Sequence, residues 1–202
     1  MMLCGDAVSR ETEDKLLRFL ALLKEWNSKI NLVGRANEDL WWNRHVLDSL
    51  QLVPLLPPND GPIVDLGSGA GLPGLILALI TGRPTHLIES DRRKAAFLIE
   101  ATRILDLRYV IVHGIRIEAA LPPPAAVVTA RALAPLTDLL QHSFRLLAPN
   151  GITLFPKGRT AEDELTAAAT RWIMRVERFP SRTNPQSTIL RISEISPAGA
   201  KA

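Results

Sequence analysis

Cysteine is nearly absent from this sequence, in which Cys4 stands alone among 202 residues. A single cysteine excludes an intrachain disulfide and a metal site built from cysteine thiolates. No apolar run approaches the ~20 residues that a membrane-spanning helix needs, and residues 1–15 lack the apolar core of a secretory signal peptide. We therefore expect a cytoplasmic protein without membrane attachment.

The sequence also offers little that would support chemistry by a general base or a metal. It contains no recognisable Ser/His/Asp set and no cluster of metal-ligating side chains, so we predict no metal site. The histidines are scattered, and we interpret each as structural rather than catalytic. They are His45, His86, His113 and His142.

Charge is modest and unevenly distributed. The formal net charge is +3 and the sequence pI is near 9.3. Residues 1–60 carry seven Lys and Arg against nine Asp and Glu, whereas residues 61–202 carry 17 against 12. The basic second part suggests an anionic partner, and a solvated surface explains it equally well.

The chain begins with a predicted helical extension. Leu16, Phe19 and Leu23 recur at helical spacing and predict an amphipathic helix over 9–28, with Ser9 as its N-cap. A second helix is predicted over 38–53, and the connector that follows, PLLPPNDGP, is rich in proline. The predicted division of the chain is a helical extension (1–60), a main domain (61–195) and a tail (196–202).

After the connector, short apolar runs alternate with helical segments. Strands are predicted at 62–66, 85–89, 109–113, 125–131 and 151–156, and helices at 75–80, 92–105 and 136–147. This alternation predicts a doubly wound α/β fold, with a mostly parallel sheet and helices on both faces. Two further strands, 171–179 and 187–193, are expected to form an antiparallel edge.

The first strand is followed by the glycine-rich run GSGAGLPG. Gly69, Gly71 and Gly74 spell G-x-G-x-x-G, the dinucleotide fingerprint. Counted from Asp65, the same run spells D-x-G-x-G-x-G, the pattern of class I methyltransferases. In both cases the glycines let the backbone approach a ligand closely at a helix N-terminus.

Two acidic residues accompany the loop. Glu89 ends the second strand, 22 residues after Gly67, where its carboxylate can accept both hydroxyls of a ribose. That spacing suits NAD and S-adenosylmethionine alike. Asp65 lies just before the loop, where it could orient the loop or reach an ammonium group. Together with a chain too short for a full dehydrogenase, Asp65 favours S-adenosylmethionine.

Blocks along nearly the whole chain carry a more specific likeness. They are KEWNSKINLVG (24–34), RHVLDSL (44–50), IVDLGSGAGLPGL (63–75), ESDRRKAAFL (89–98), TARALAPL (129–136), FPKG (155–158) and STILRI (187–192). In these blocks the chain resembles the GidB family of small-subunit (16S) ribosomal RNA methyltransferases, which act on N7 of a guanine. The resemblance implies that S-adenosylmethionine is the methyl donor and that the partner is 16S ribosomal RNA within the small ribosomal subunit. We expect the protein to be a monomer.

The resemblance and the glycine motif together predict the cofactor-binding residues. They are Asp65, Gly67, Gly69, Gly71, Leu72, Glu89, Ile117, Glu118 and Arg131.

Several cations are candidates for binding RNA. Arg131 ends a predicted strand, and Arg116 and Lys157 each follow one, at the sheet edge where ligands bind in open α/β folds. We predict that Arg131 and Lys157 position the substrate. The predicted RNA-binding residues are Arg44, Arg92, Arg93, Lys94, Arg116 and Lys157. Solvated charges at strand ends and on a helix face are the alternative interpretation of these residues.

The expected reaction fits the lack of a general base, because N7 of guanine already presents a lone pair. Two other functions remain open from the sequence. One is an NAD(P)-binding oxidoreductase or regulatory module, which titration with both cofactors would distinguish. The other is an RNA-binding protein without catalysis, which a turnover assay with RNA would distinguish.

Overall fold

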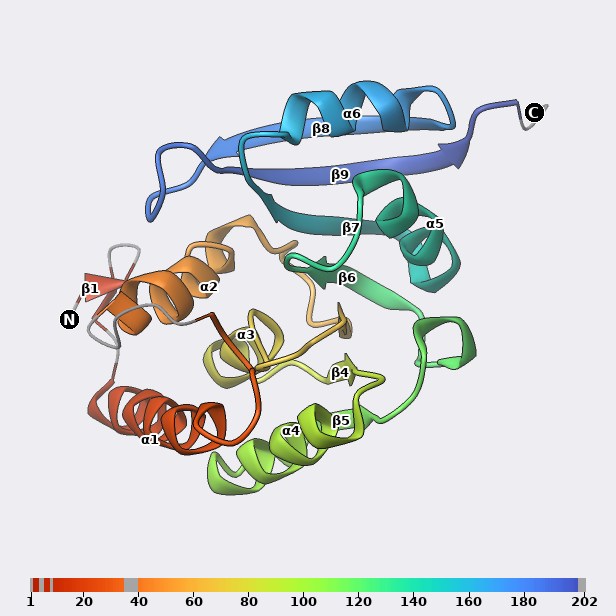
Figure 1. Cartoon of the computed structure of the whole chain (residues 1–202). Coiled ribbons are helices and arrows are strands. Elements are labelled where there is room, and N and C mark those ends of the chain that lie inside the picture. Colours follow the sequence, from red (N-terminus) through yellow and green to blue (C-terminus); the bar gives the residue numbers. More distant parts are fainter. Residues whose placement is uncertain (1, 4–5, 8, 35–39, 200–202) are drawn as a thin grey trace.

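The computed structural model describes residues 2–3, 6–7, 9–34 and 40–199, and its main feature is one seven-stranded sheet (Figure 1). The strands of this sheet are β3 (Ile63–Leu66), β4 (Thr85–Ile88), β5 (Val110–His113), β6 (Ala125–Ala130), β7 (Leu147–Lys157), β8 (Trp172–Pro180) and β9 (Thr188–Pro197). A separate antiparallel pair is formed by β1 (Met2–Leu3) and β2 (Asp6–Ala7).

Helices cover both faces of the sheet. The α-helices are α1 (Arg10–Asn27), α2 (Asp48–Leu50), α3 (Gly74–Thr81), α4 (Arg92–Ile104), α5 (Leu136–Leu146) and α6 (Ala161–Ala169). The other helical turns are η2 (Trp42–Leu47), η3 (Val53–Leu55) and η4 (Ile117–Ala119). None of the described helices combines the length and the apolarity that crossing a membrane would require.

The strand order is β5-β4-β3-β6-β7-β9-β8. The first five strands in this order pair in parallel, and β9 pairs antiparallel with both β7 and β8. The predicted fold class and its antiparallel edge are confirmed. Because the strands from β5 to β7 run in one direction, the loops at their carboxyl ends meet along a single edge, which is where the predicted site residues lie.

Local signals in the sequence account for several of the element ends. The hydroxyl of Ser9 accepts a hydrogen bond from the Thr12 amide at 3.1 Å, so the predicted N-cap of α1 is confirmed. The Asp91 carboxylate caps α4 in the same way. Gly82 adopts φ +68° and ends α3, a left-handed conformation that glycine tolerates best.

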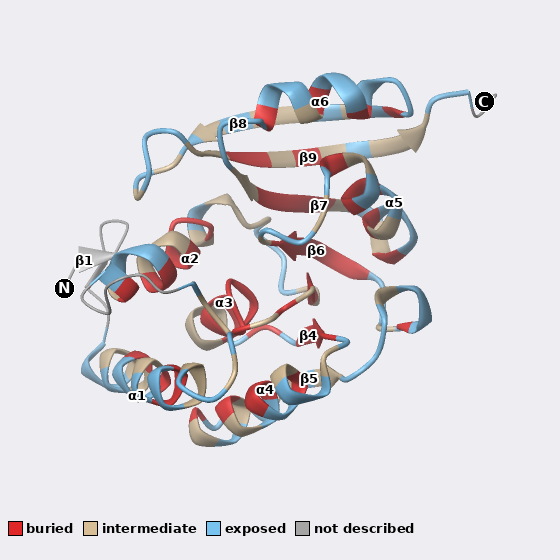
Figure 2. Ribbon diagram, in the orientation of Figure 1, coloured by how far each residue is buried: buried red, intermediate tan, exposed pale blue. Residues whose placement is uncertain are grey.

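The helical extension shares its core with the rest of the chain. Leu16, Phe19 and Leu23 of α1 are buried in one apolar cluster with Phe97 and Leu98 of α4 (Figure 2). The rings of Phe19 and Phe97 lie 6.4 Å apart between centroids. Truncation of a buried Phe to Ala costs about 3–5 kcal/mol, so this face contributes substantially to holding the extension against the sheet.

Several segments differ from the prediction, among them β9, which runs to Pro197 rather than ending at 193. The second predicted helix begins at 38, outside the described residues, and within them it is a π-helical η2, one turn of α2 and the 3-10 turn η3. Strand β7 starts at Leu147, before the predicted 151. Its pairing with β6 begins at Leu147 opposite Ala125, and a bulge separates this pair from the next one, Ile152 opposite Val127. Helix α6 was not predicted at all.

Candidate functional site

The glycine run forms the loop between β3 and α3, and each of its first three glycines has positive φ, +60° at Gly67, +51° at Gly69 and +77° at Gly71. A Cβ at Gly71 would lie 2.3 Å from Leu75 Cδ1, so Gly71 permits close packing of loop and helix. For a Cβ at Gly69 the nearest contact, outside the flanking residues, would be the Gly67 carbonyl oxygen at 3.7 Å. Gly69 therefore keeps space for a ligand.

Glu89 holds the glycine loop by its carboxylate. Its Oε2 accepts a hydrogen bond from the Gly69 amide at 2.9 Å, and its Oε1 accepts one from the Asp91 amide at 2.8 Å. The residue is only 8 % exposed and lines a cavity beside the loop. A carboxylate has about four acceptor sites, so two remain for the hydroxyls of a ligand.

Asp65 lies beneath the loop rather than in the cavity wall. Its Oδ1 accepts a hydrogen bond from the Thr129 hydroxyl at 2.8 Å, whereas Oδ2 is buried without a hydrogen-bond partner in the described part of the chain. Burial raises the pKa of Asp65 to about 6, although the bond from Thr129 opposes the shift. A buried carboxylate in this position can respond to a cation bound above it.

The cavity beside the loop has a volume of about 360 Å³ and lies at the carboxyl edge of the sheet. Its walls bring together six of the predicted cofactor-binding residues: Gly67, Gly69, Glu89, Ile117, Glu118 and Arg131. The other three, Asp65, Gly71 and Leu72, are not in these walls. Open space at Gly69 and free acceptor sites on Glu89 fit an adenosine-containing ligand.

Other residues of this cavity were missed by the sequence reasoning. They are Ile88, Ser90, Ile115, Ala132, Leu133, Ala134 and His142. Most of them lie at or just after the carboxyl end of a strand of the parallel sheet, and this position could have identified them as candidate site residues. The backbone of the η4 segment is fixed from α5, because the Arg145 guanidinium donates to the carbonyl oxygens of Ile117 and Glu118. Nothing in the local sequence points to that Arg145 contact.

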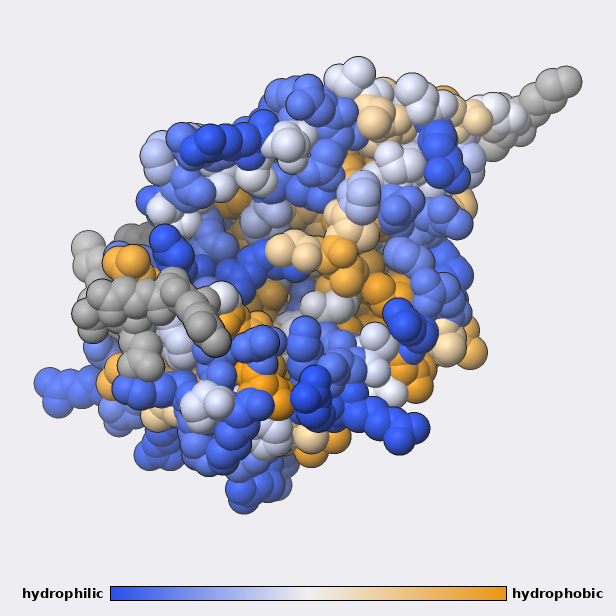
Figure 3. Space-filling view, viewed as in Figure 1, coloured by the Kyte–Doolittle hydropathy of each residue, from blue (hydrophilic) through white to orange (hydrophobic). Residues whose placement is uncertain are grey.

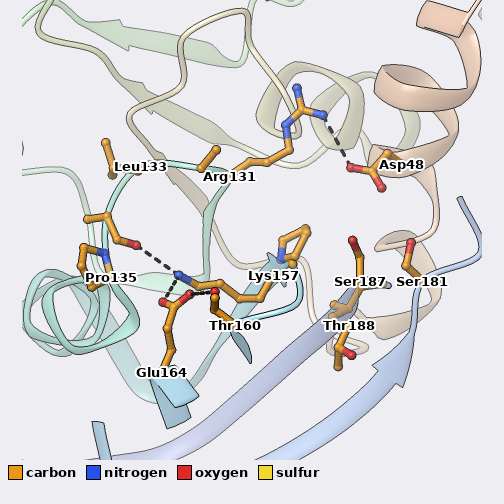
Figure 4. A pocket seen from close by; sticks show the side chains of 15 residues that line it. Asp48, Arg131, Leu133, Pro135, Lys157, Thr160, Glu164, Ser181, Ser187 and Thr188 are labelled. Carbon is orange, nitrogen blue, oxygen red and sulfur yellow. Dashed lines mark hydrogen bonds and ion pairs between the residues drawn. The ribbon is translucent and has the colours of Figure 1, made fainter. Parts of the chain in front are cut away.

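A second, larger cavity of about 660 Å³ adjoins the first. Both are lined by residues 131–134, the start of the loop between β6 and α5. Figure 4 shows Arg131 facing Asp48 on one side of this cavity, and Lys157 with Glu164 on another. We call it the ion-pair cavity. On the face viewed in Figure 3, a central hollow has hydrophilic side chains on its left and hydrophobic ones on its right.

Arg131 joins the extension to the sheet edge. Its Nη1 lies 3.5 Å from Asp48 Oδ2 and donates to the Arg44 carbonyl oxygen at 3.1 Å. Asp48 also accepts hydrogen bonds from Gln51 and from the Thr183 hydroxyl. The RHVLDSL block is therefore tied, through its aspartate and one of its carbonyls, to the loop that lines both cavities.

Lys157 is held by the protein itself. Its Nζ lies 2.7 Å from Glu164 Oε2 and donates to the Ala134 carbonyl oxygen at 3.1 Å. Burial acts to raise the pKa of Glu164, but hydrogen bonds from Lys157 and the Leu136 amide outweigh it and lower that pKa. Lys157 thus secures the shared wall, and its predicted contact with RNA stays a prediction.

The remaining predicted RNA-binding cations lie on the surface. Arg44, Arg92, Arg93 and Arg116 are exposed, and Lys94 is half-buried. Lys94 lines the cofactor-sized cavity and also a groove beside the end of α1. Arg116 lines the cofactor-sized cavity as well, and the four exposed side chains are accessible to a polyanion.

His45 of the RHVLDSL block is buried near Arg131. Neither of its ring nitrogens has a hydrogen-bond partner within the described residues. Burial, reinforced by the charge of Arg131, lowers the pKa of His45 to about 4. The imidazole is therefore neutral at physiological pH, which agrees with a structural role.

Comparison with known proteins identifies the family. The family model GidB, described as rRNA small subunit methyltransferase G, matches residues 12–189. The ribosomal RNA small subunit methyltransferase G of Granulibacter bethesdensis is 57% identical over 192 residues, which cover 95% of this chain and 90% of that protein. The protein of the same name from Rhodospirillum centenum is 56% identical and is covered over 88% of its length.

Solved structures agree on the fold. The ribosomal protein L11 methylase of Lactobacillus delbrueckii subsp. bulgaricus superposes with a TM-score of 0.61 at 12% identity, over 78% of this chain and 79% of that one. A SAM-dependent methyltransferase from Aquifex aeolicus gives 0.60 at 13% identity, over 86% and 97%. The predicted resemblance is confirmed, and the chain belongs to the GidB family of rRNA small subunit methyltransferases G.

Proposed function

We propose that this protein transfers the methyl group of S-adenosylmethionine to N7 of a guanine in 16S ribosomal RNA. The observation that carries the proposal is the match of the family model over residues 12–189, together with a glycine loop that leaves ligand space at Gly69 beside a partly unsatisfied Glu89. Four solved structures of the same fold are complexes with AdoMet, MeSAdo or SAH.

The reaction needs no proton transfer. When bound, the cofactor supplies a methyl carbon activated by a positively charged sulfur. The N7 lone pair forms the new C–N bond as the C–S bond breaks, and the bonding pair stays on sulfur. The positive charge moves to the guanine ring, so the residues of this chain have to align the reactants and exclude water. Alignment alone supplies roughly 7–11 kcal/mol in favourable cases.

Each part of the site has a task in this scheme. Glu89 orients the adenosine end by its ribose, and the buried Asp65 carboxylate offsets positive charge on the cofactor. Arg131 and the loop that follows it line both cavities and so place the cofactor and the base side by side. Exposed cations such as Arg92 and Arg116 hold RNA phosphates at the rim. Deep burial of N7 in the major groove of A-form RNA requires a target base that is unpaired or extruded.

We further propose that the protein acts in the cytoplasm as a monomer on the small ribosomal subunit. The extension (1–60), the methyltransferase domain (61–195) and the tail (196–202) would work as one unit. Support comes from the shared core of α1 and α4 and from Asp48, which the extension contributes to the ion-pair cavity.

The test is methylation of small ribosomal subunits from cells that lack this protein, followed by aniline cleavage at N7-methylguanine. We expect one new cleavage site in 16S RNA with the wild-type protein, and none with Gly69→Val, whose side chain would occupy ligand space. Methyl transfer to protein or to a small molecule, with 16S RNA unchanged, would contradict the substrate. Calorimetry with S-adenosylmethionine and NAD separates a methyltransferase from an oxidoreductase.

A further inference from the structure

The ion-pair cavity has a position that suits the methyl acceptor. It shares the lining residues 131–134 with the cavity assigned to the cofactor, so ligands bound in the two cavities would both contact this loop and lie next to each other. Its volume of about 660 Å³ is that of an ordinary small-ligand site. A single extruded nucleotide is a small ligand of the kind that such sites hold.

The charges in the walls favour an uncharged ligand over a phosphate. The two cations in them are Arg131 and Lys157, and each is paired with a carboxylate and bonded to a backbone carbonyl. Their side chains are only 23 % and 11 % exposed. An RNA phosphate here would compete with both carboxylates, whereas a neutral base would disturb neither pair. Phosphates therefore belong at the exposed rim.

One carboxylate in this cavity is positioned to read a base. Asp48 is 19 % exposed, and its Oδ1 is saturated by Gln51 at 2.8 Å and by the Thr183 hydroxyl at 2.6 Å. Oδ2 has only the long 3.5 Å contact with Arg131 among the described residues. These three neighbours fix the carboxylate in place while Oδ2 keeps acceptor capacity toward the cavity.

We propose that the ion-pair cavity receives the target guanine and that Asp48 recognises the N1–H and 2-amino donors of its Watson–Crick edge. This inference rests on the proposed function. Guanine presents these two donors side by side, whereas adenine presents a ring-nitrogen acceptor at N1, which a carboxylate repels. Recognition through this edge leaves the N7 lone pair free to react, because N7 lies on a different edge of the base.

The test replaces one exocyclic group of the substrate. The guanine located by aniline cleavage is changed to inosine, which keeps N7, O6 and N1–H and lacks only the 2-amino group, and the RNA is assembled into small subunits. A hydrogen bond to a charged acceptor is lost, so we expect kcat/KM of the wild-type protein to fall about 10- to 100-fold.

Asp48→Asn provides the second arm. We expect it to methylate guanine subunits poorly and to show at most a threefold difference between guanine and inosine, because Asn presents an N–H where Oδ2 stood. Its affinity for S-adenosylmethionine should stay within threefold of wild type. The matched control is Asp106→Asn, which removes an exposed carboxylate that pairs with Arg108 and does not line the ion-pair cavity. This variant should keep the full inosine effect.

The outcomes separate the two proposals. No N7-methylation of 16S RNA by the wild-type protein contradicts the proposed function itself. Normal methylation of guanine subunits with equal turnover of inosine subunits overturns the role of Asp48 alone, and this arm needs no variant that might misfold. An inosine effect that persists unchanged in Asp48→Asn also overturns that role, since a purely structural aspartate would leave the discrimination intact.

Discussion

Replacement of Glu89 by Gln should weaken both the fold and the cofactor site. The carboxylate accepts from the Gly69 amide through one oxygen and from the Asp91 amide through the other. Gln retains one oxygen and turns an N–H group toward the second amide, which is left unsatisfied at a position only 8 % exposed. An orphaned buried donor costs about 1–3 kcal/mol. In a chain of this length that lowers the Tm by about 2–12 °C.

Urea unfolding and thermal melting without cofactor measure this first effect, and calorimetry with S-adenosylmethionine measures the second. We expect the affinity to fall because the glycine loop loses an anchor and the ribose loses a charged acceptor. Glu118→Gln is the matched control for stability, because its carboxylate is 70 % exposed and lines the same cavity. The reasoning would be refuted if the free energy of unfolding of Glu89→Gln lay within about 0.5 kcal/mol of the wild-type value, which is roughly the spread in the measured contribution of one hydrogen bond.

Further predictions concern the glycine loop and two buried ionisable groups. Gly69→Ala should weaken cofactor binding in calorimetry with a smaller loss of stability than Gly71→Ala, whose Cβ overlaps Leu75. His45 protonates at its ordinary pKa of 6.5 when unfolded and at about 4 when folded, so it lowers stability as pH falls through that window, by at most about 3 kcal/mol. Urea titrations from pH 7 to 4 should show a shallower decline for His45→Phe; identical slopes would contradict this. Asp65, with a pKa raised to about 6, should release a proton when the cationic cofactor binds at pH 6 and release less at pH 8. Calorimetry in buffers of different ionisation heat measures the release, which Asp65→Asn should abolish.

The order of elements could be predicted because the sequence marks it locally. Apolar runs of strand length alternate with helical periodicity, and this alone gives the parallel sheet and its antiparallel edge. Helix α6 escaped because its buried face consists only of Ala161, Leu165 and Ala168, which is too small an apolar stripe to stand out. The early start of β7 was hidden by Pro149-Asn150-Gly151, which resembles a turn and forms a bulged strand instead.

The site was predictable in its position and less so in its contacts. Glycines and a carboxylate at strand ends indicate a ligand at the carboxyl edge, and Gly69 and Glu89 lie there. The partners of Arg131 and Lys157 could not be found in the same way, because Asp48 and Glu164 are brought to them by tertiary folding. Two cations that look free in the sequence are therefore neutralised in the structure, and that difference decides which ligand the cavity suits.

The wall of residues 131–134 is common to the cofactor cavity and the ion-pair cavity. Lys157 holds the Ala134 carbonyl, and Glu164 holds the Leu136 amide just beyond it. A ligand that shifts this wall from one side alters the cavity on the other, so the two binding equilibria are coupled. Thermodynamic linkage makes the coupling reciprocal: whatever factor the cofactor adds to the affinity for RNA, RNA must add to the affinity for the cofactor. In the proposed reaction, the affinity for the spent cofactor and the affinity for the methylated subunit are then linked through one short loop.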